Sequence, residues 1–131
     1  MRTLVDTSAW IELFNGGDGP LAEKVARLVE ADEAVVSGLI RCELLAGFRS
    51  DAAFARAADT LAAFVEIDDA SAAVRDRAVA IYRGCRKKGT TVRSLVDCLI
   101  AAAAIEAGLP ILHRDRDFAA IARRFPLQIA G

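Results

Sequence analysis

Short apolar runs and longer stretches of helical periodicity alternate along the chain. Four runs have the length and composition of strands: 3–5, 34–37, 64–67 and 110–113. Between and after them, apolar side chains recur every three or four residues, which predicts helices over 7–14, 21–29, 39–48, 54–61, 70–88, 94–107 and 115–124. A small edge strand is expected at 127–129. Strands that alternate with helices form parallel sheets. We therefore expect one α/β domain over residues 1–131, with a short parallel sheet of four to five strands covered by helices on both faces.

The helix predicted at 94–107 contains one residue that does not fit an apolar environment. From Leu95 to Ile105, Asp97 is the only polar or charged side chain. A helix that is apolar on every side is usually buried, and an ionised carboxylate there is costly unless it is paired, hydrogen-bonded or bound to a metal. Asp97 is therefore either a structural cap or part of a functional site.

Composition narrows the class of protein. The chain has 131 residues, of which 54% are hydrophobic and 6% aromatic, a composition that favours closely packed helices around a modest sheet. No apolar run is long enough to span a bilayer, and nothing in the first residues has the pattern of a signal peptide. The cysteines, Cys42, Cys85 and Cys98, form no CxxC pair and are expected to be buried and reduced. We expect a cytoplasmic protein with no membrane association.

Charge is nearly balanced, at −1 overall, but it is unevenly distributed. Residues 75–93 contain seven Arg or Lys side chains and one Asp. This segment is either the solvated face of an amphipathic helix or a surface that contacts phosphates. On the second interpretation, the candidate RNA-binding residues are Arg86, Lys87, Arg93 and Arg114.

Carboxylates follow the predicted strands or begin the helices beside them. Asp6 follows the first strand, Glu43 lies early in the helix after the second, and Asp97 lies near the start of its helix. Asp115 and Asp117 follow the fourth strand. In a parallel sheet these positions share the edge at which ligands bind. Carboxylates this close repel one another unless a cation is bound or one is protonated, and oxygen ligands alone indicate a hard cation, Mg²⁺ or Mn²⁺.

Each acidic residue also has a structural explanation. Asp6 and Asp115 are possible helix N-caps, and Ser94 with Asp97 fits a capping-box pattern. Glu43 has the sequence context of an exposed helix residue, and Asp117 that of a first-turn residue favoured by the helix dipole. The only histidine, His113, excludes a two-histidine metal site and is expected at a strand end.

Four segments together resemble a known family. VDTSAWI (5–11), CELLAG (42–47), SLVDCLIA (94–101) and HRDRDF (113–118) are similar, in order and spacing, to the acidic motifs of PIN-domain proteins, and specifically of VapC-like toxins. The resemblance covers the whole chain. It implies a Mg²⁺- or Mn²⁺-dependent endoribonuclease that is the toxin of a type II toxin–antitoxin pair, forms a homodimer and is silenced by a cognate antitoxin.

The resemblance also assigns residues. Asp6, Glu43, Asp97 and Asp115 would form the catalytic acidic site, with Asp117 as an additional or alternative metal ligand beside Asp6, Asp97 and Asp115. Thr7 and Ser8 follow the first carboxylate and are expected to tune it by hydrogen bonding. Trp10, Phe14, Leu21 and Val25 flank the glycine-rich turn at 16–19. They are either ordinary core residues or part of a groove for antitoxin docking, and their exposure decides between the two.

Three other classes of protein compete with this interpretation. A haloacid-dehalogenase-like phosphatase requires its DxD motif directly after the first strand, whereas here Asp115 and Asp117 lie near the C-terminus. A receiver domain requires an acidic pair after its first strand, and the pair Asp68–Asp69 lies elsewhere. The third is a PIN-fold binding module without catalytic activity, which metal binding would distinguish.

Overall fold

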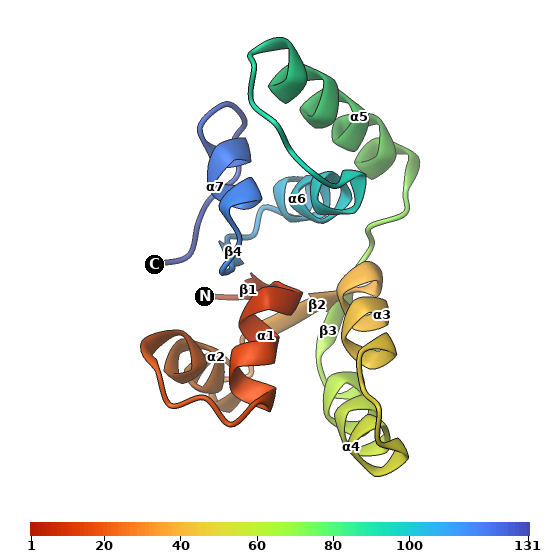
Figure 1. The fold of residues 1–131 in the computed structure, drawn as a ribbon, viewed down its shortest axis with the longest axis vertical. Coiled ribbons are helices and arrows are strands. Elements are labelled where there is room, and N and C mark those ends of the chain that lie inside the picture. Colours follow the sequence, from red (N-terminus) through yellow and green to blue (C-terminus); the bar gives the residue numbers. More distant parts are fainter.

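The computed structural model describes residues 1–131 as a four-stranded parallel sheet with seven helices around it (Figure 1). The elements in chain order are β1 (Thr3–Val5), α1 (Thr7–Phe14), α2 (Pro20–Glu30), β2 (Ala34–Ser37), α3 (Gly38–Ala46), α4 (Asp51–Ala62), β3 (Val65–Ile67), α5 (Ala72–Lys87), α6 (Leu95–Ala107), β4 (Ile111–Leu112) and α7 (Arg116–Ala122). None of these helices is long and apolar enough to cross a membrane.

The strand order β3-β2-β1-β4 makes β1 and β2 the central strands. Leu4 pairs with Val35 of β2 on one side and with Ile111 of β4 on the other, and all the pairings are parallel. Helices α1 to α4 lie on one side of the sheet and α5 to α7 on the other (Figure 1). Because both faces are covered, β1 and β2 are buried along their whole lengths.

Side-chain caps and turn residues determine where the helices begin and end. Ser37, Ser50, Ser71 and Ser94 each accept a hydrogen bond from a backbone N–H in the first turn of α3, α4, α5 and α6, respectively. Helix α6 ends at Gly108, which has a φ of 68°, a left-handed conformation that favours glycine. The caps begin α3 and α6 directly at the edge of the sheet where β1 and β2 end, and so bring Glu43 and Asp97 to that edge.

The structure confirms the predicted fold class and corrects some details. The last predicted strand, 127–129, is reduced to a single parallel bridge between Ile111 and Ile129. Cys85 and Cys98 are buried as expected, but Cys42 is exposed, because it lies on the solvent side of the short helix α3. The prediction that all three cysteines are buried is therefore wrong for Cys42.

Candidate acidic site

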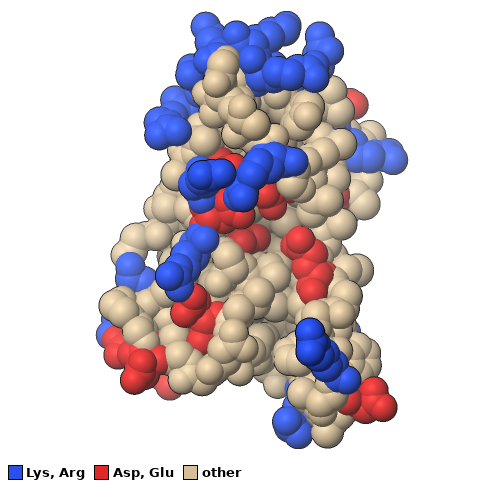
Figure 2. Space-filling view, viewed as in Figure 1, with Lys and Arg blue, Asp and Glu red and all other residues tan.

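Each acidic residue singled out in the sequence lies at or close to the C-terminal edge of the sheet. Asp6 follows β1 and caps α1, Glu43 lies in α3, and Asp97 lies in the first turn of α6. Asp115 caps α7 and Asp117 lies in the first turn of the same helix. We call these five residues the acidic site. Figure 2 shows acidic side chains gathered in the middle of one face, with basic side chains beside them.

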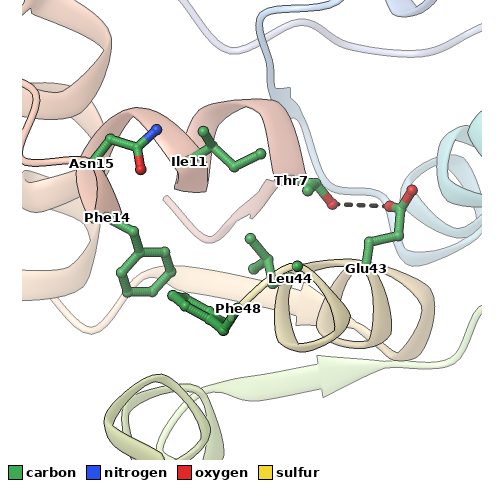
Figure 3. Close-up of a pocket in the computed structure, with 8 residues that line it drawn as sticks. Thr7, Ile11, Phe14, Asn15, Glu43, Leu44 and Phe48 are labelled. Atoms are coloured by element: carbon green, nitrogen blue, oxygen red, sulfur yellow. Dashed lines mark hydrogen bonds between the residues drawn. The ribbon is translucent and has the colours of Figure 1, made fainter. Parts of the chain in front are cut away.

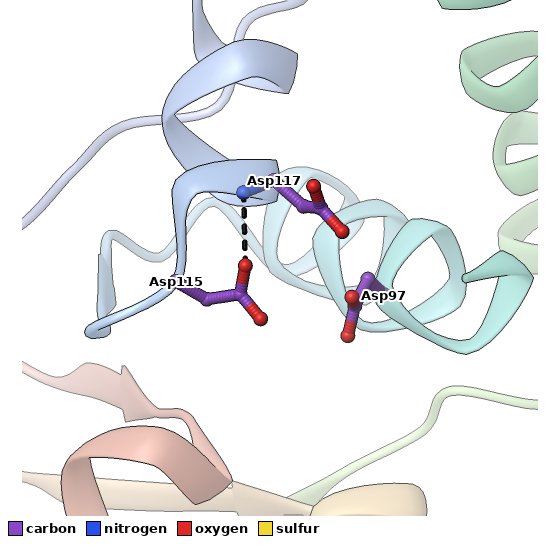
Figure 4. A group of neighbouring side chains, drawn as sticks. All are labelled: Asp97, Asp115 and Asp117. Atoms are coloured by element: carbon purple, nitrogen blue, oxygen red, sulfur yellow. Dashed lines mark hydrogen bonds between the residues drawn. The ribbon is translucent and has the colours of Figure 1, made fainter. Parts of the chain in front are cut away.

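Three of the five carboxylates are close enough to share one ion. Asp97, Asp115 and Asp117 each offer an oxygen, and these oxygens lie within 4.8 Å of one another. Figure 4 shows Asp97 pointing from α6 toward the two aspartates at the start of α7. The sequence left open whether Asp115 or Asp117 is the fourth acidic residue of the site. In the structure both belong to the same cluster.

Asp6 and Glu43 act on this cluster through their charge. The pKa of Asp97 is raised from 3.8 to about 7, first by burial and then by the charges of Asp115, Asp6, Asp117 and Glu43. Burial is also the main cause that raises the pKa of Asp6, and hydrogen bonds from Ser8 oppose it. Burial raises the pKa of Glu43 as well, with Asp6 contributing. A bound cation would remove this mutual repulsion.

Asp97 does not behave as a cap. Ser94 occupies the N-cap position of α6 and accepts a hydrogen bond from the N–H of Val96 at 3.1 Å. The Asp97 carboxylate receives no hydrogen bond that would stabilise its charge. The capping-box interpretation of Asp97 is therefore not supported, whereas Asp6 and Asp115 are N-caps as well as members of the acidic site.

Ser8 orients Asp6, as expected, whereas the hydroxyl of Thr7, expected to act on Asp6 as well, orients Glu43. The Ser8 hydroxyl and N–H donate to Oδ2 of Asp6 at 2.6 Å and 3.0 Å. The Thr7 hydroxyl donates to Oε1 of Glu43 at 2.9 Å and so connects α1 to α3 (Figure 3). The Ser8 oxygen also accepts the N–H of Arg114 at 2.9 Å, which ties α1 to the segment that carries Asp115.

Arg93 binds two carboxylates of the acidic site. Its Nη2 lies 3.2 Å from Oδ1 of Asp115, and its Nε and its backbone N–H each lie 3.3 Å from Oδ2 of Asp117. Asp117 is 2% exposed, so these donors compensate a carboxylate that is almost wholly removed from water. The sequence indicated Arg93 only as a candidate RNA contact and gave no signal for this pairing.

His113 supports the site through the backbone. Its Nδ1 accepts the N–H of Asp115 at 2.9 Å, and its ring packs against Phe118 with centroids 5.3 Å apart. Burial lowers the pKa of His113, which favours the neutral ring with its proton on Nε2. His113 therefore fixes the start of the turn that carries Asp115.

The remaining candidate RNA-binding residues lie outside the acidic site. Arg114 forms an ion pair with Glu12 of α1. Arg86 lies over the ring of Tyr82, 5.5 Å from its centroid, and Lys87 is exposed at the end of α5. Their contact with RNA stays a prediction.

An apolar groove borders the acidic site between α1 and α3, and Phe14 is the one residue of the expected groove that lines it. It is lined mainly by Ile11 and Phe14 of α1 and by Leu44 and Phe48 of α3 and the residues after it, with Thr7 and Glu43 at its acidic end (Figure 3). The expected groove included Trp10 and Val25, but both are 0% exposed. That prediction is wrong for these two residues, because Trp10 packs inward against Phe64 with ring centroids 5.4 Å apart.

The arrangement fits a hard divalent cation. The cluster supplies oxygen donors only. Cys98, the cysteine next to Asp97, is a buried thiol with its pKa raised to about 12, first by burial. Mg²⁺ and Mn²⁺ prefer such oxygen ligands. A bound cation would also relieve the repulsion among the neighbouring carboxylates that, with burial, raises the pKa of Asp97.

The fold and this acidic edge define a PIN domain: a profile of that family matches residues 3–124. The chain therefore belongs to the PIN-domain family. It is 42% identical to the VapC ribonuclease Mb1587 of Mycobacterium bovis, in a match that covers 98% of this chain and 97% of the relative. This membership rules against the two competing classes, the haloacid-dehalogenase-like phosphatase and the receiver domain.

Solved structures give the same fold. The VapBC2 structure from Rickettsia felis, bound to a DNA fragment from its promoter, superposes with a TM-score of 0.77 at 18% identity and covers 99% of this chain and 98% of its own. A toxin–antitoxin complex from Klebsiella pneumoniae has a TM-score of 0.73 at 25% identity, with 98% of this chain and 100% of that chain covered.

Proposed function

We propose that this protein is a divalent-metal-dependent endoribonuclease and the toxin of a toxin–antitoxin pair. The observation that carries the proposal is the convergence of Asp97, Asp115 and Asp117 within 4.8 Å. The 42% identity to a VapC ribonuclease, over 98% of this chain, supports RNA as the substrate. A PIN fold that only binds a partner would have no need of three carboxylates with oxygens within 4.8 Å of one another, and metal binding distinguishes the two functions.

Asp97, Asp115 and Asp117 would hold the cation, with Asp6 and Glu43 completing the charge around it. A bound Mg²⁺ or Mn²⁺ supplies charge neutralisation at the phosphate and a lowered pKa for water. The chain's own residues do the positioning. Thr7 and Ser8 fix the orientations of Glu43 and Asp6, and the N–H of Asp117 orients Asp115.

Arg93 gives the acidic site a positive neighbour at its α7 side. Its guanidinium bridges Asp115 and Asp117 and its side chain is 56% exposed, so it stands where an RNA phosphate would approach. A guanidinium in that position binds a phosphate oxygen readily. Arg93 would thus exchange a carboxylate for a phosphate when the substrate binds.

Restoration of cleavage by divalent ions tests the proposal. Purified protein should lose cleavage of labelled RNA in excess EDTA and regain it with Mg²⁺ or Mn²⁺. Asp115→Asn and Asp117→Asn should each abolish cleavage. Asp59→Asn, a change at an exposed position of α4 outside the site, should leave it intact. Cleavage that continues unchanged in EDTA would overturn the metal dependence.

The apolar groove is our candidate for the antitoxin. Solved relatives of this fold include toxin–antitoxin complexes. A partner helix would place its apolar face against Ile11, Phe14 and Phe48 and bring a basic residue toward Glu43 at the acidic end. A homodimer, expected from the resemblance, stays a prediction.

A further inference from the structure

A second hollow lies beside the acidic site, on the opposite side from the apolar groove. It is a cleft of about 400 Å³ between the 89–93 loop and α7. Its lining includes Thr90, Thr91, Arg93, Arg116 and Arg123, with one hydrophobic residue among eight. We call it the arginine cleft. Asp117 lines it as well, so the cleft and the acidic site are contiguous.

The polar groups of this cleft are largely unused within the chain. Arg116 and Arg123 are exposed and form none of the ion pairs of the molecule. The N–H of Thr91 has no backbone acceptor, whereas that of Thr90 donates to Cys85. The guanidinium groups of Arg116 and Arg123 and the N–H and hydroxyl of Thr91 thus face one hollow without a partner in the chain, so donors outnumber acceptors there.

Such a set favours an anion, and the position favours one on the substrate. The only acid in the lining, Asp117, is compensated by Arg93 through two hydrogen bonds of 3.3 Å, so it subtracts little from the positive charge. Guanidinium groups recognise phosphate oxygens through paired hydrogen bonds. The cleft shares Asp117 with the acidic site, so it is within reach of the phosphate next to one that lies at that site.

We propose that the arginine cleft is a subsite for a phosphate of single-stranded RNA that is not cleaved, one next to the reacting phosphate along the strand. This inference rests on the proposed ribonuclease function and adds to it where the strand lies. Arg116, Arg123 and Thr91 hold this phosphate, and the strand then runs past α7. The exposed end of α5, with Arg86 and Lys87, lies beyond the cleft on the far side of the 89–93 loop.

The test compares two variants with equal change of charge. Arg116→Ala/Arg123→Ala removes the free cations of the cleft, and Arg2→Ala/Arg56→Ala removes two exposed arginines elsewhere. RNA cleavage with Mn²⁺ is measured for KM and kcat, and the affinity for a labelled RNA octamer is measured by fluorescence anisotropy in EDTA across a range of salt. Thermal midpoints show whether both variants are folded.

For the cleft variant we expect KM to rise about tenfold, as for the loss of charged hydrogen bonds, with kcat changed less than about twofold. The dependence of log affinity on log salt should become shallower by about 0.7 for each phosphate that the variant no longer binds. A neutral methylphosphonate at the bound position of the octamer should weaken binding by the wild type but not by the variant.

Two outcomes overturn the inference. If the cleft variant and the control variant have the same KM and the same salt dependence, the cleft does not bind RNA. An acidic protein segment would then be the remaining candidate ligand. If kcat falls with KM unchanged, the arginines act in the reaction and not as a subsite. A wild-type protein that cleaves no RNA with any divalent ion refutes the ribonuclease function itself, whereas the anisotropy measurement still reports on the cleft.

Discussion

Asp97→Asn should stabilise the metal-free protein while it abolishes cleavage. The pKa of Asp97 rises from 3.8 to about 7 in the fold, through burial and four neighbouring carboxylates. A pKa difference of about three units corresponds to a free-energy difference of roughly 4 kcal/mol between the ionised and neutral forms. Because the side chain is only partly buried and solvent screens its neighbours, we expect about 1–2 kcal/mol. Asparagine removes this cost, since it has the size of the neutral acid and no charge.

The size of this stabilisation depends on pH in a way that identifies its cause. A carboxyl with a raised pKa in the fold contributes its full stability below its unfolded pKa, near 3.8, and loses it as the pH rises through about 7. Wild type and the variant should therefore be equally stable near pH 4 and should diverge up to about pH 7. In EDTA at pH 8, the variant should unfold about 4–8 °C higher.

Bound metal should make wild type more stable to heat than the Asp97→Asn variant, the reverse of their order in EDTA. An ion at a hundredfold excess over its dissociation constant stabilises the fold by about 2.7 kcal/mol, and the variant, with one ligand fewer, should gain much less from Mn²⁺. Thermal unfolding from pH 4 to pH 8, with and without Mn²⁺, measures both effects, and Asp59→Asn is the matched control. A variant that is destabilised at every pH yet cleaves RNA normally would refute the reasoning, because Asp97 would then be a structural residue.

Three further changes test other parts of the structure. Arg86→Ala with Lys87→Ala should weaken RNA binding and flatten its salt dependence by about 0.7 for each phosphate that these side chains neutralise; an unchanged slope in anisotropy measurements would return these residues to a plain solvated surface. Asp69→Ala should lower the free energy of unfolding by about 1–3 kcal/mol in urea, because the buried Asp69 accepts the N–H of Leu39 at 2.7 Å at the start of α3; a decrease below about 0.5 kcal/mol would contradict this. Ile11→Lys, at a residue 44% exposed, should abolish antitoxin binding in pull-down or calorimetry while RNA cleavage persists, and binding at wild-type affinity would place the antitoxin elsewhere.

The elements and the acidic residues were predictable because each depends on a local rule. The periodicity of apolar residues indicates helix or strand within a few residues, and Asp6, Asp97 and Asp115 follow strands or caps that the sequence marks directly. Parallel strands then bring them to one edge without any knowledge of side-chain contacts. For the same reason the sequence predicted both Asp115 and Asp117 as candidates: they are two residues apart at the start of one helix.

The contacts that depend on long-range packing were not predictable in this way. Arg93 reaches Asp115 and Asp117 only because the 89–93 loop returns beside α7. The apolar groove depends on how α1 and α3 meet, and no pattern within either helix reports that. Trp10 has the spacing of an exposed groove residue relative to Phe14, yet it is buried because Phe64, far along the chain, covers it.

The hydrogen bond between Ser8 and the N–H of Arg114 spans 106 residues, and it has a consequence for synthesis. The first and the last acidic residues of the site lie near opposite ends of the sequence, so a chain still being translated holds Asp6 long before it holds Asp115. A nascent chain on the ribosome lacks the complete set of carboxylates until the segment 111–117 has emerged and its strand β4 has paired with β1. The acidic site is thus completed only when the segment that carries Asp115 and Asp117 has folded against the rest of the domain.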